Sequence, residues 1–147
     1  MTGIVALASD HAAVDLKAAL RDWLIESGYQ VDDLGPDGEV SVDYPDYAYK
    51  LAQNIALGKA RWGVALCGSG IGISIAVNRN PAARCALVSD NLSARLARQH
   101  NDANVIAMGA RLIGIETAKD CLQAFLSTPF VGDRHVRRVE KLSNPKI

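Results

Sequence analysis

The sequence predicts an α/β protein with a five-stranded parallel sheet and helices on both of its faces. Two observations support this class. Short, continuously apolar segments alternate with longer segments whose apolar residues recur at helical spacing. Continuous apolar runs are typical of strands buried on both faces, and their alternation with helices is typical of parallel βα units. The chain has 147 residues, so we expect one three-layer αβα domain over residues 1–147.

The first predicted elements lie between the N-terminus and residue 35. The run "IVALAS" at 4–9 is continuously apolar and predicts a buried strand. The segment 12–27 predicts a helix that Gly28 can end, because apolar residues stand at helical spacing at Val14, Leu16, Leu20, Leu24 and Ile25. The run "YQVDDLG" at 29–35 predicts a second, short strand.

Turn-forming residues separate the next elements. Pro, Asp and Gly predict a loop over 36–43. The segment 45–58 opens with Pro and closes with Gly, which is typical of a helix. The run "WGVALC" at 62–67 predicts a third, fully buried strand. A glycine-rich turn follows it, and "GISIAVNR" at 72–79 predicts a helix that ends before an Asn-Pro pair.

The remainder of the chain continues the alternation. Strands are expected at 84–90 and 104–110, and helices at 92–100 and 115–127. A last helix is expected at 131–143, with a basic cluster near its start: Arg134, His135, Arg137 and Arg138.

The composition argues against several classes of protein. Lys plus Arg number 16 and Asp plus Glu number 16, so net charge gives no argument for a nucleic-acid or membrane-surface partner. The 3 cysteines form no CxxC pair, which argues against a disulfide framework and a zinc site. The N-terminus lacks a signal-peptide pattern, and no apolar run is long enough to span a membrane. We therefore expect a cytoplasmic protein without a metal.

Polar residues and glycines follow four of the predicted strands. Asp10 and His11 follow the first, Cys67 ends the third, and Ser89–Asp90 and Gly109–Arg111 follow the last two. Ligands of parallel α/β sheets bind outside the carboxyl ends of the strands. This edge of the sheet is therefore the predicted site.

The loop after the third predicted strand carries the strongest local signal. Gly68, Gly70 and Gly72 alternate beside Cys67. Backbone N–H groups at the start of a helix bind anions, and glycine lets a ligand approach closely. A tight turn without a ligand would explain one glycine, but three beside a cysteine favour a binding loop.

Three known loop motifs do not match this segment. A P-loop requires GxxxxGK[ST], which is absent. A cysteine-phosphatase loop has an arginine six residues after the cysteine, where this chain has Ile73. The dinucleotide fingerprint GxGxxG/A also fails at Ile73. Asp90 nevertheless lies about 20 residues after the loop, where that fingerprint places an acidic residue. Nucleotide binding therefore remains an alternative.

Cys67 is the candidate reactive thiol, because a helix N-terminus makes the thiolate more available. The alternative is a buried structural thiol, which is our interpretation of Cys85 and Cys121. None of the 3 histidines has a partner at metal-ligand spacing, so each is either a site residue or a capping or surface residue: His11, His100 and His135.

Arg134 and Arg138 are four residues apart, so they share one helix face. Such a pair can bind a phosphate through several donors. A solvated basic helix is the alternative interpretation.

Five motifs together resemble the ribose-5-phosphate isomerase type B family, which also includes allose-6-phosphate and galactose-6-phosphate isomerases. They are "ASDHAA", "VDYPDYA", "CGSGIGISIAVNR", "RQHNDANVIAMGAR" and "GDRHVRRV", and the resemblance runs from Ile4 to about Leu142. It implies a Rossmann-like αβα fold without a nucleotide. It also implies a homodimer, sometimes paired into a tetramer, whose active site lies at the dimer interface and needs no metal or cofactor.

The resemblance assigns roles to matching positions. Cys67 is the implied base and His100 the implied acid that opens the sugar ring, with Asp10 and Ser69 as further catalytic residues. Ser69 stands where many members have threonine, and Ile73 stands where a second branch of the family has a catalytic glutamate. The implied substrate-binding residues are Asp10, His11, Tyr44, Gly68, Ser69, Gly70, Ile71, Gly72, Asn101, Arg111, Arg134 and Arg138.

The implied reaction is the interconversion of ribose 5-phosphate and ribulose 5-phosphate through an enediolate, in pentose phosphate metabolism. A thiolate above a ring of backbone N–H groups suits this chemistry, because it supplies a base and donors for the enediolate oxygens. The alternatives are an isomerase of a hexose 6-phosphate (allose or galactose) and a non-catalytic module that binds a nucleotide or sugar phosphate. The expected partners are a small phosphorylated sugar and a second copy of the chain, without nucleic acid or membrane.

Overall fold

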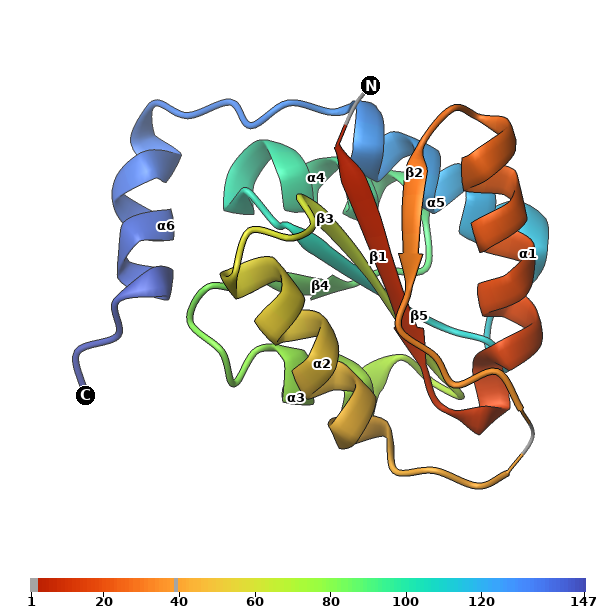
Figure 1. Ribbon diagram of the computed structural model, residues 1–147. Coiled ribbons are helices and arrows are strands. Elements are labelled where there is room, and N and C mark those ends of the chain that lie inside the picture. Colours follow the sequence, from red (N-terminus) through yellow and green to blue (C-terminus); the bar gives the residue numbers. More distant parts are fainter. Residues whose placement is uncertain (1–2, 39) are drawn as a thin grey trace.

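The computed structural model describes residues 3–38 and 40–147 and confirms the expected α/β class (Figure 1). Five strands form an all-parallel sheet in the order β2-β1-β3-β5-β4. Because β3 lies between β1 and β5, the carboxyl ends of these three strands are neighbours. The strands are β1 (Ile4–Ser9), β2 (Gln30–Asp33), β3 (Trp62–Cys67), β4 (Cys85–Leu87) and β5 (Val105–Gly109).

Helices cover both faces of the sheet, as the alternating pattern predicts. One face packs against α1, α4 and α5, and the other against α2 and α3. Alternate residues of β3 point to opposite faces. The side chain of Cys67 therefore lies on the face covered by α2 and α3. The helices are α1 (Val14–Glu26), α2 (Tyr44–Ala56), α3 (Ile71–Val77), α4 (Asn91–Asn101), α5 (Ile115–Ser127) and α6 (Arg134–Ser143).

Several element boundaries differ from the predicted ones. The helix expected at 12–27 begins with a 3₁₀ turn at His11–Ala13, because the Asp10 side chain caps it by accepting from the N–H of Ala12. The strand expected at 84–90 is shortened to Cys85–Leu87, which among the described strands pairs only with β5. The helix expected at 131–143 begins at Arg134, because Asp133 has a φ of 54° and interrupts the helical backbone.

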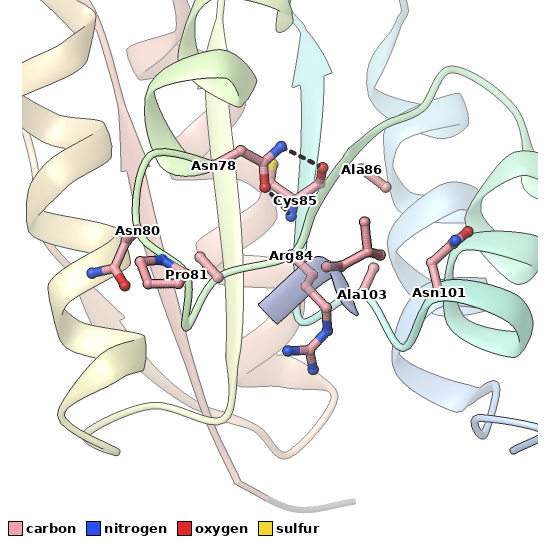
Figure 2. Close-up of a pocket in the computed structure, with 10 residues that line it drawn as sticks. Asn78, Asn80, Pro81, Arg84, Cys85, Ala86, Asn101 and Ala103 are labelled. Carbon is pink, nitrogen blue, oxygen red and sulfur yellow. Dashed lines mark hydrogen bonds between the residues drawn. The ribbon is translucent and has the colours of Figure 1, made fainter. Parts of the chain in front are cut away.

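The outer edge of β4 is closed by a side chain. The carboxamide of Asn78 accepts from the N–H of Cys85 at 2.8 Å and donates to its carbonyl at 2.9 Å (Figure 2). It thus takes the place of a neighbouring strand, which protects an edge that could otherwise pair with another chain. Burial raises the pKa of the Cys85 thiol to about 12, but the residue is only half-buried and packs against the edge of the core.

A buried ion pair joins α1 to the end of β2. Lys17 is 1% exposed, and its Nζ lies 2.6 Å from Oδ1 of Asp33. Burial opposes ionisation of this carboxyl, but hydrogen bonds from Lys17 and from the N–H of Gly35 outweigh burial and hold the Asp33 pKa below its usual value. The carbonyl of Gly35 in turn accepts from the N–H of Ser9. The pair therefore anchors the start of the 36–43 loop beside the end of β1.

The C-terminal helix α6 stands apart from the two helical layers, beside α4 (Figure 1). The segment before it is bound to α4 through the N–H of Val131, which donates to the carbonyl of Gln99. Near its end, Ser143 Oγ lies 3.4 Å from a guanidinium nitrogen of Arg84. In the described part of the chain, no helix has the length and apolar character needed to cross a membrane.

Candidate active site

Cys67 lies at the end of β3 with its sulfur directed at a backbone N–H. The residue is 4% exposed, and its Sγ accepts from the N–H of Gly70 at 3.1 Å. Gly70 has a φ of 77°, in the left-handed region that favours glycine, and it precedes the first residue of α3. An N–H donor at this position interacts more strongly with a thiolate than with a thiol.

The glycines allow two loops and a tyrosine to pack closely. A Cβ at Gly70 would lie 2.7 Å from the backbone of Met108, and one at Gly109 would lie 2.6 Å from the backbone of Ser69. A Cβ at Gly72 would lie 2.6 Å from the Tyr44 ring. Close packing therefore requires these glycines, independently of any ligand, and it holds Tyr44 against the loop.

The same loop offers free donors. Within residues 3–38 and 40–147, the backbone N–H groups of Gly68 and Ser69 have no hydrogen-bond acceptor, whereas that of Ile71 donates to Ser69 Oγ at 3.2 Å. Gly68 faces Arg111, since a Cβ there would lie 3.4 Å from its guanidinium. The N–H of Arg111 donates to the Gly68 carbonyl at 2.9 Å. A cation and free N–H groups therefore lie beside the thiol.

Asp10 and His11 lie next to this loop, at the end of β1. Asp10 is 8% exposed, and its N–H donates to the carbonyl of Leu66 in β3. His11 Nδ1 accepts from the N–H of Val42 at 3.1 Å. This contact ties the imidazole to the 36–43 loop and leaves Nε2 as the nitrogen that can donate to a ligand.

A second group of predicted site residues gathers where α4 ends and α6 begins. The rings of His100 and His135 stack with centroids 4.5 Å apart and planes 13° apart. His135 is only 6% exposed, so interpreting it as a surface histidine is wrong. Burial, reinforced by the charges of Arg134, His100 and Arg138, lowers the His135 pKa. Asn101, Arg134 and Arg138 lie near this pair and are exposed.

No signal in the sequence singles out His135 as a partner of His100. The two residues are far apart in the chain, and each is an ordinary histidine on a helix. Only the docking of α6 beside α4 brings their rings together.

The two groups lie at opposite edges of the sheet. Cys67 is the last residue of β3, at its carboxyl end, whereas His100 and Asn101 directly precede the segment that enters the amino end of β5. Because β3 has six residues, at about 3.3 Å per residue the edges are roughly 16 Å apart. One chain therefore does not bring Cys67 and His100 within reach of the same small molecule.

Asn101 lines a cavity of about 380 Å³ between β4 and α6 (Figure 2). Arg84 and Leu142 also line this cavity, and Cys67 does not. The cavity thus belongs to the second group of residues. It leaves space beside the end of α4 that the chain itself does not fill.

Asp90, the residue that kept nucleotide binding open, has a structural role. Its carboxylate caps α4 by accepting from the N–H of Ser93 at 2.7 Å and from Ser93 Oγ at 2.9 Å. These hydrogen bonds lower the Asp90 pKa. Its place after a strand therefore reflects helix capping. Among the described residues, no cluster of three or more His, Cys, Asp or Glu side chains is arranged to hold a metal ion.

Comparison with known proteins indicates the same family as the sequence motifs do. A family model described as "Ribose/Galactose Isomerase" matches residues 5–142. The chain is 40% identical to ribose-5-phosphate isomerase B of Escherichia coli (strain K12) over 139 residues, which covers 95% of this chain and 93% of that protein. It is 44% identical to D-erythrulose-4-phosphate isomerase of Pectobacterium atrosepticum over 140 residues, covering 94% and 91%.

A solved structure is similar over nearly the whole length. The crystal structure of a ribose 5-phosphate isomerase from Thermotoga maritima superimposes with a TM-score of 0.94 at 48% identity, covering 96% of this chain and 97% of that one.

Proposed function

Because the chain belongs to the ribose/galactose isomerase family and is a sugar-phosphate aldose–ketose isomerase, we propose that it interconverts ribose 5-phosphate and ribulose 5-phosphate, with Cys67 as the base. The observation that carries the proposal is the contact between Cys67 Sγ and the N–H of Gly70, beside the free N–H groups of Gly68 and Ser69. Isomerisation removes a proton from the carbon next to a carbonyl. The base must therefore lie beside donors that stabilise the enediolate oxygens.

The residues of the carboxyl edge take complementary roles in this proposal. Cys67 transfers the proton between the two carbons, and the loop from Gly68 to Gly72 holds the enediolate. Ser69, which replaces the family's usual threonine, offers a hydroxyl to the same oxygens, and Asp10 binds the sugar hydroxyls. His11 donates from Nε2 and Arg111 supplies a cation, while Tyr44 closes the side of the pocket against Gly72.

The second group supplies ring opening and phosphate binding. Ribose 5-phosphate exists mostly as a closed furanose, so an acid must protonate the ring oxygen before the proton transfer. We assign that acid to His100, with Asn101 beside it, and we assign the phosphate to Arg134 and Arg138. A bound phosphate holds the reacting carbon in place, which converts binding energy into orientation.

The separation of the two groups supports a homodimer. Cys67 and His100 serve one pocket only if they come from different chains, since each chain keeps them at opposite edges of the sheet. The exposed face of α6 and the unfilled cavity beside Asn101 provide surfaces for such a partner. Two dimers could pair further into a tetramer.

The proposal also includes a cytoplasmic location. The three cysteines of the chain are free, which suits a reducing compartment.

Hexose 6-phosphates are the second candidate substrates, because the matching family model also covers galactose isomerases. The proposal is tested by measuring kcat/KM for ribose 5-phosphate, allose 6-phosphate and galactose 6-phosphate with the purified protein. Erythrulose 4-phosphate is added because a relative carries that name. Ribose 5-phosphate should give the highest value. A higher value for another sugar would replace it as the substrate, and no turnover of any would overturn the catalytic role.

The arginines of α6 are expected to act on phosphate affinity. Replacing either Arg134 or Arg138 with Ala should weaken competitive inhibition by inorganic phosphate by roughly 10- to 100-fold, because a charge-assisted contact is lost. The matched control is Arg95→Ala, which removes an exposed arginine of α4 that is bound to Asn91. An unchanged inhibition constant in both α6 variants would refute their role.

The composite pocket predicts complementation between inactive chains. A mixture of Cys67→Ala and His100→Asn chains should regain activity after subunit exchange, because one of the two pockets in a heterodimer then has both residues intact. The measurement is activity against exchange time, with each variant alone as the control. Absence of recovery after verified exchange would mean that both residues serve the pocket of one chain.

A further inference from the structure

A buried arginine two residues before His100 joins the parts of the second group. Arg98 is 5% exposed, and its guanidinium lies over the ring of Trp62 at 4.6 Å. Its Nη1 donates to the carbonyl of Ala103 at 2.6 Å and to Oδ1 of Asp102 at 2.9 Å. Its Nε donates to the carbonyl of Thr128 at 3.2 Å. The guanidinium of Arg98 is thus buried, and two carbonyls and a carboxylate accept its hydrogen bonds.

The hydrogen bond from Arg98 to Asp102 fixes the end of α4. Asp102 has a φ of 46°, a left-handed conformation that is uncommon for a residue with a side chain. Its carboxylate is bound by Arg98 and, at 3.3 Å, by Arg84, which also donates from Nε to the Asp102 carbonyl. Two arginines therefore hold the helix end directly after His100 and Asn101.

The hydrogen bond from Arg98 to Thr128 fixes the segment that leads to α6. Thr128 directly follows α5 and begins the segment that leads to Arg134 and His135. That segment is bound again to α4 where Val131 donates to Gln99. Through Thr128 on one side and Asp102 on the other, Arg98 links the two chain segments whose histidines stack.

We propose that Arg98 is a positioning residue that keeps His100 in register with the phosphate-binding arginines of α6. The inference rests on the proposed roles of His100, Arg134 and Arg138. Stability alone does not explain a buried arginine, because well-packed apolar residues often replace buried ion pairs without loss of stability. A planar fork that binds two carbonyls and a carboxylate at once does fix the geometry between the segment after α4 and the segment after α5.

The test compares Arg98→Met with the surface control Arg95→Met. In Arg98→Met, kcat from aldose to ketose should fall about 10- to 100-fold, as expected when an acid is displaced by about an ångström. Inhibition by inorganic phosphate should weaken as well. The rate at which iodoacetamide alkylates Cys67 should remain within about twofold of the wild type, because the substitution leaves the glycine loop and the Gly70 N–H that contact the thiol unchanged. Arg95→Met should match the wild type in all three.

Two results would overturn the proposal. One is wild-type turnover and phosphate inhibition in Arg98→Met, and the other is a change in Cys67 alkylation as large as the change in turnover, which would indicate a general loss of structure. If Arg98→Met does not fold, Arg98→Lys and Asp102→Gly take its place, since glycine adopts the left-handed φ without the carboxylate. Fully active His100→Asn would instead refute the role of His100. Phosphate inhibition would then still decide whether Arg98 positions the α6 arginines.

Discussion

Cys67→Ala is expected to lower turnover in both directions by about 10²- to 10⁴-fold, the usual contribution of a general base. Both directions pass through the same enediolate, so removal of the thiol affects them alike. Inorganic phosphate should inhibit as in the wild type, because the substitution leaves Arg134 and Arg138, to which the phosphate is assigned, unchanged. The measurements are kcat in each direction and the exchange of the ribulose 5-phosphate C1 proton with solvent deuterium.

Cys85→Ala is the matched control for this variant. Cys85 is a half-buried cysteine at the same face of the sheet as the buried Cys67, but burial raises its pKa to about 12 and it lies outside the glycine loop. It should retain turnover and proton exchange. If Cys67→Ala kept more than half of the wild-type turnover, another group would have to be the base.

His100→Asn should separate ring opening from proton transfer. At saturating ribose 5-phosphate, the closed sugar would occupy the site without opening, and kcat from aldose to ketose should fall strongly, by about 10²-fold or more. Ribulose 5-phosphate cannot close a furanose, because its 5-hydroxyl carries the phosphate. Its turnover at saturation should fall much less, since the open aldehyde can leave and cyclise in solution.

The equilibrium constant limits how this asymmetry can be seen. It fixes the ratio of kcat/KM in the two directions, so the difference must be read from kcat at saturation. The exchange of the C1 proton of ribulose 5-phosphate gives the clearest result, because it needs the base and no ring opening. His100→Asn should retain that exchange and Cys67→Ala should lose it. Loss of exchange in both variants would mean that His100 takes part in the proton transfer or holds the pocket together.

The fold class, and the gathering of the candidate site residues at the carboxyl edge of the sheet, were predictable from sequence because both depend on local patterns. The alternation of apolar runs with helical segments predicts a parallel sheet, and a parallel sheet places the residues that follow its strands at one edge. Asp10, Cys67 and Arg111 meet there because β1, β3 and β5 are neighbours. The expected roles of individual residues came from the family resemblance of the motifs, because residue spacing alone does not assign a base or an acid.

The second edge of the site was decided by tertiary structure. The stack of His100 on His135 and the hydrogen bond from Arg98 to Thr128 join segments about 30 or more positions apart. No periodicity marks such contacts, because exposed and buried polar residues look alike in a sequence. Asp90 is the opposite case. Its position after the glycine loop suggested a nucleotide-binding residue, whereas the structure shows that it caps α4.

The sequence by itself determined the sheet, its helices and the cysteine loop, because burial of apolar side chains follows short-range periodicity. Only the tertiary structure decided that Lys17 and Arg98 are buried, that Asp102 is left-handed, and that Cys67 and His100 face opposite edges. A buried charge persists only where acceptors from several segments converge on it. That convergence exists only in the folded chain.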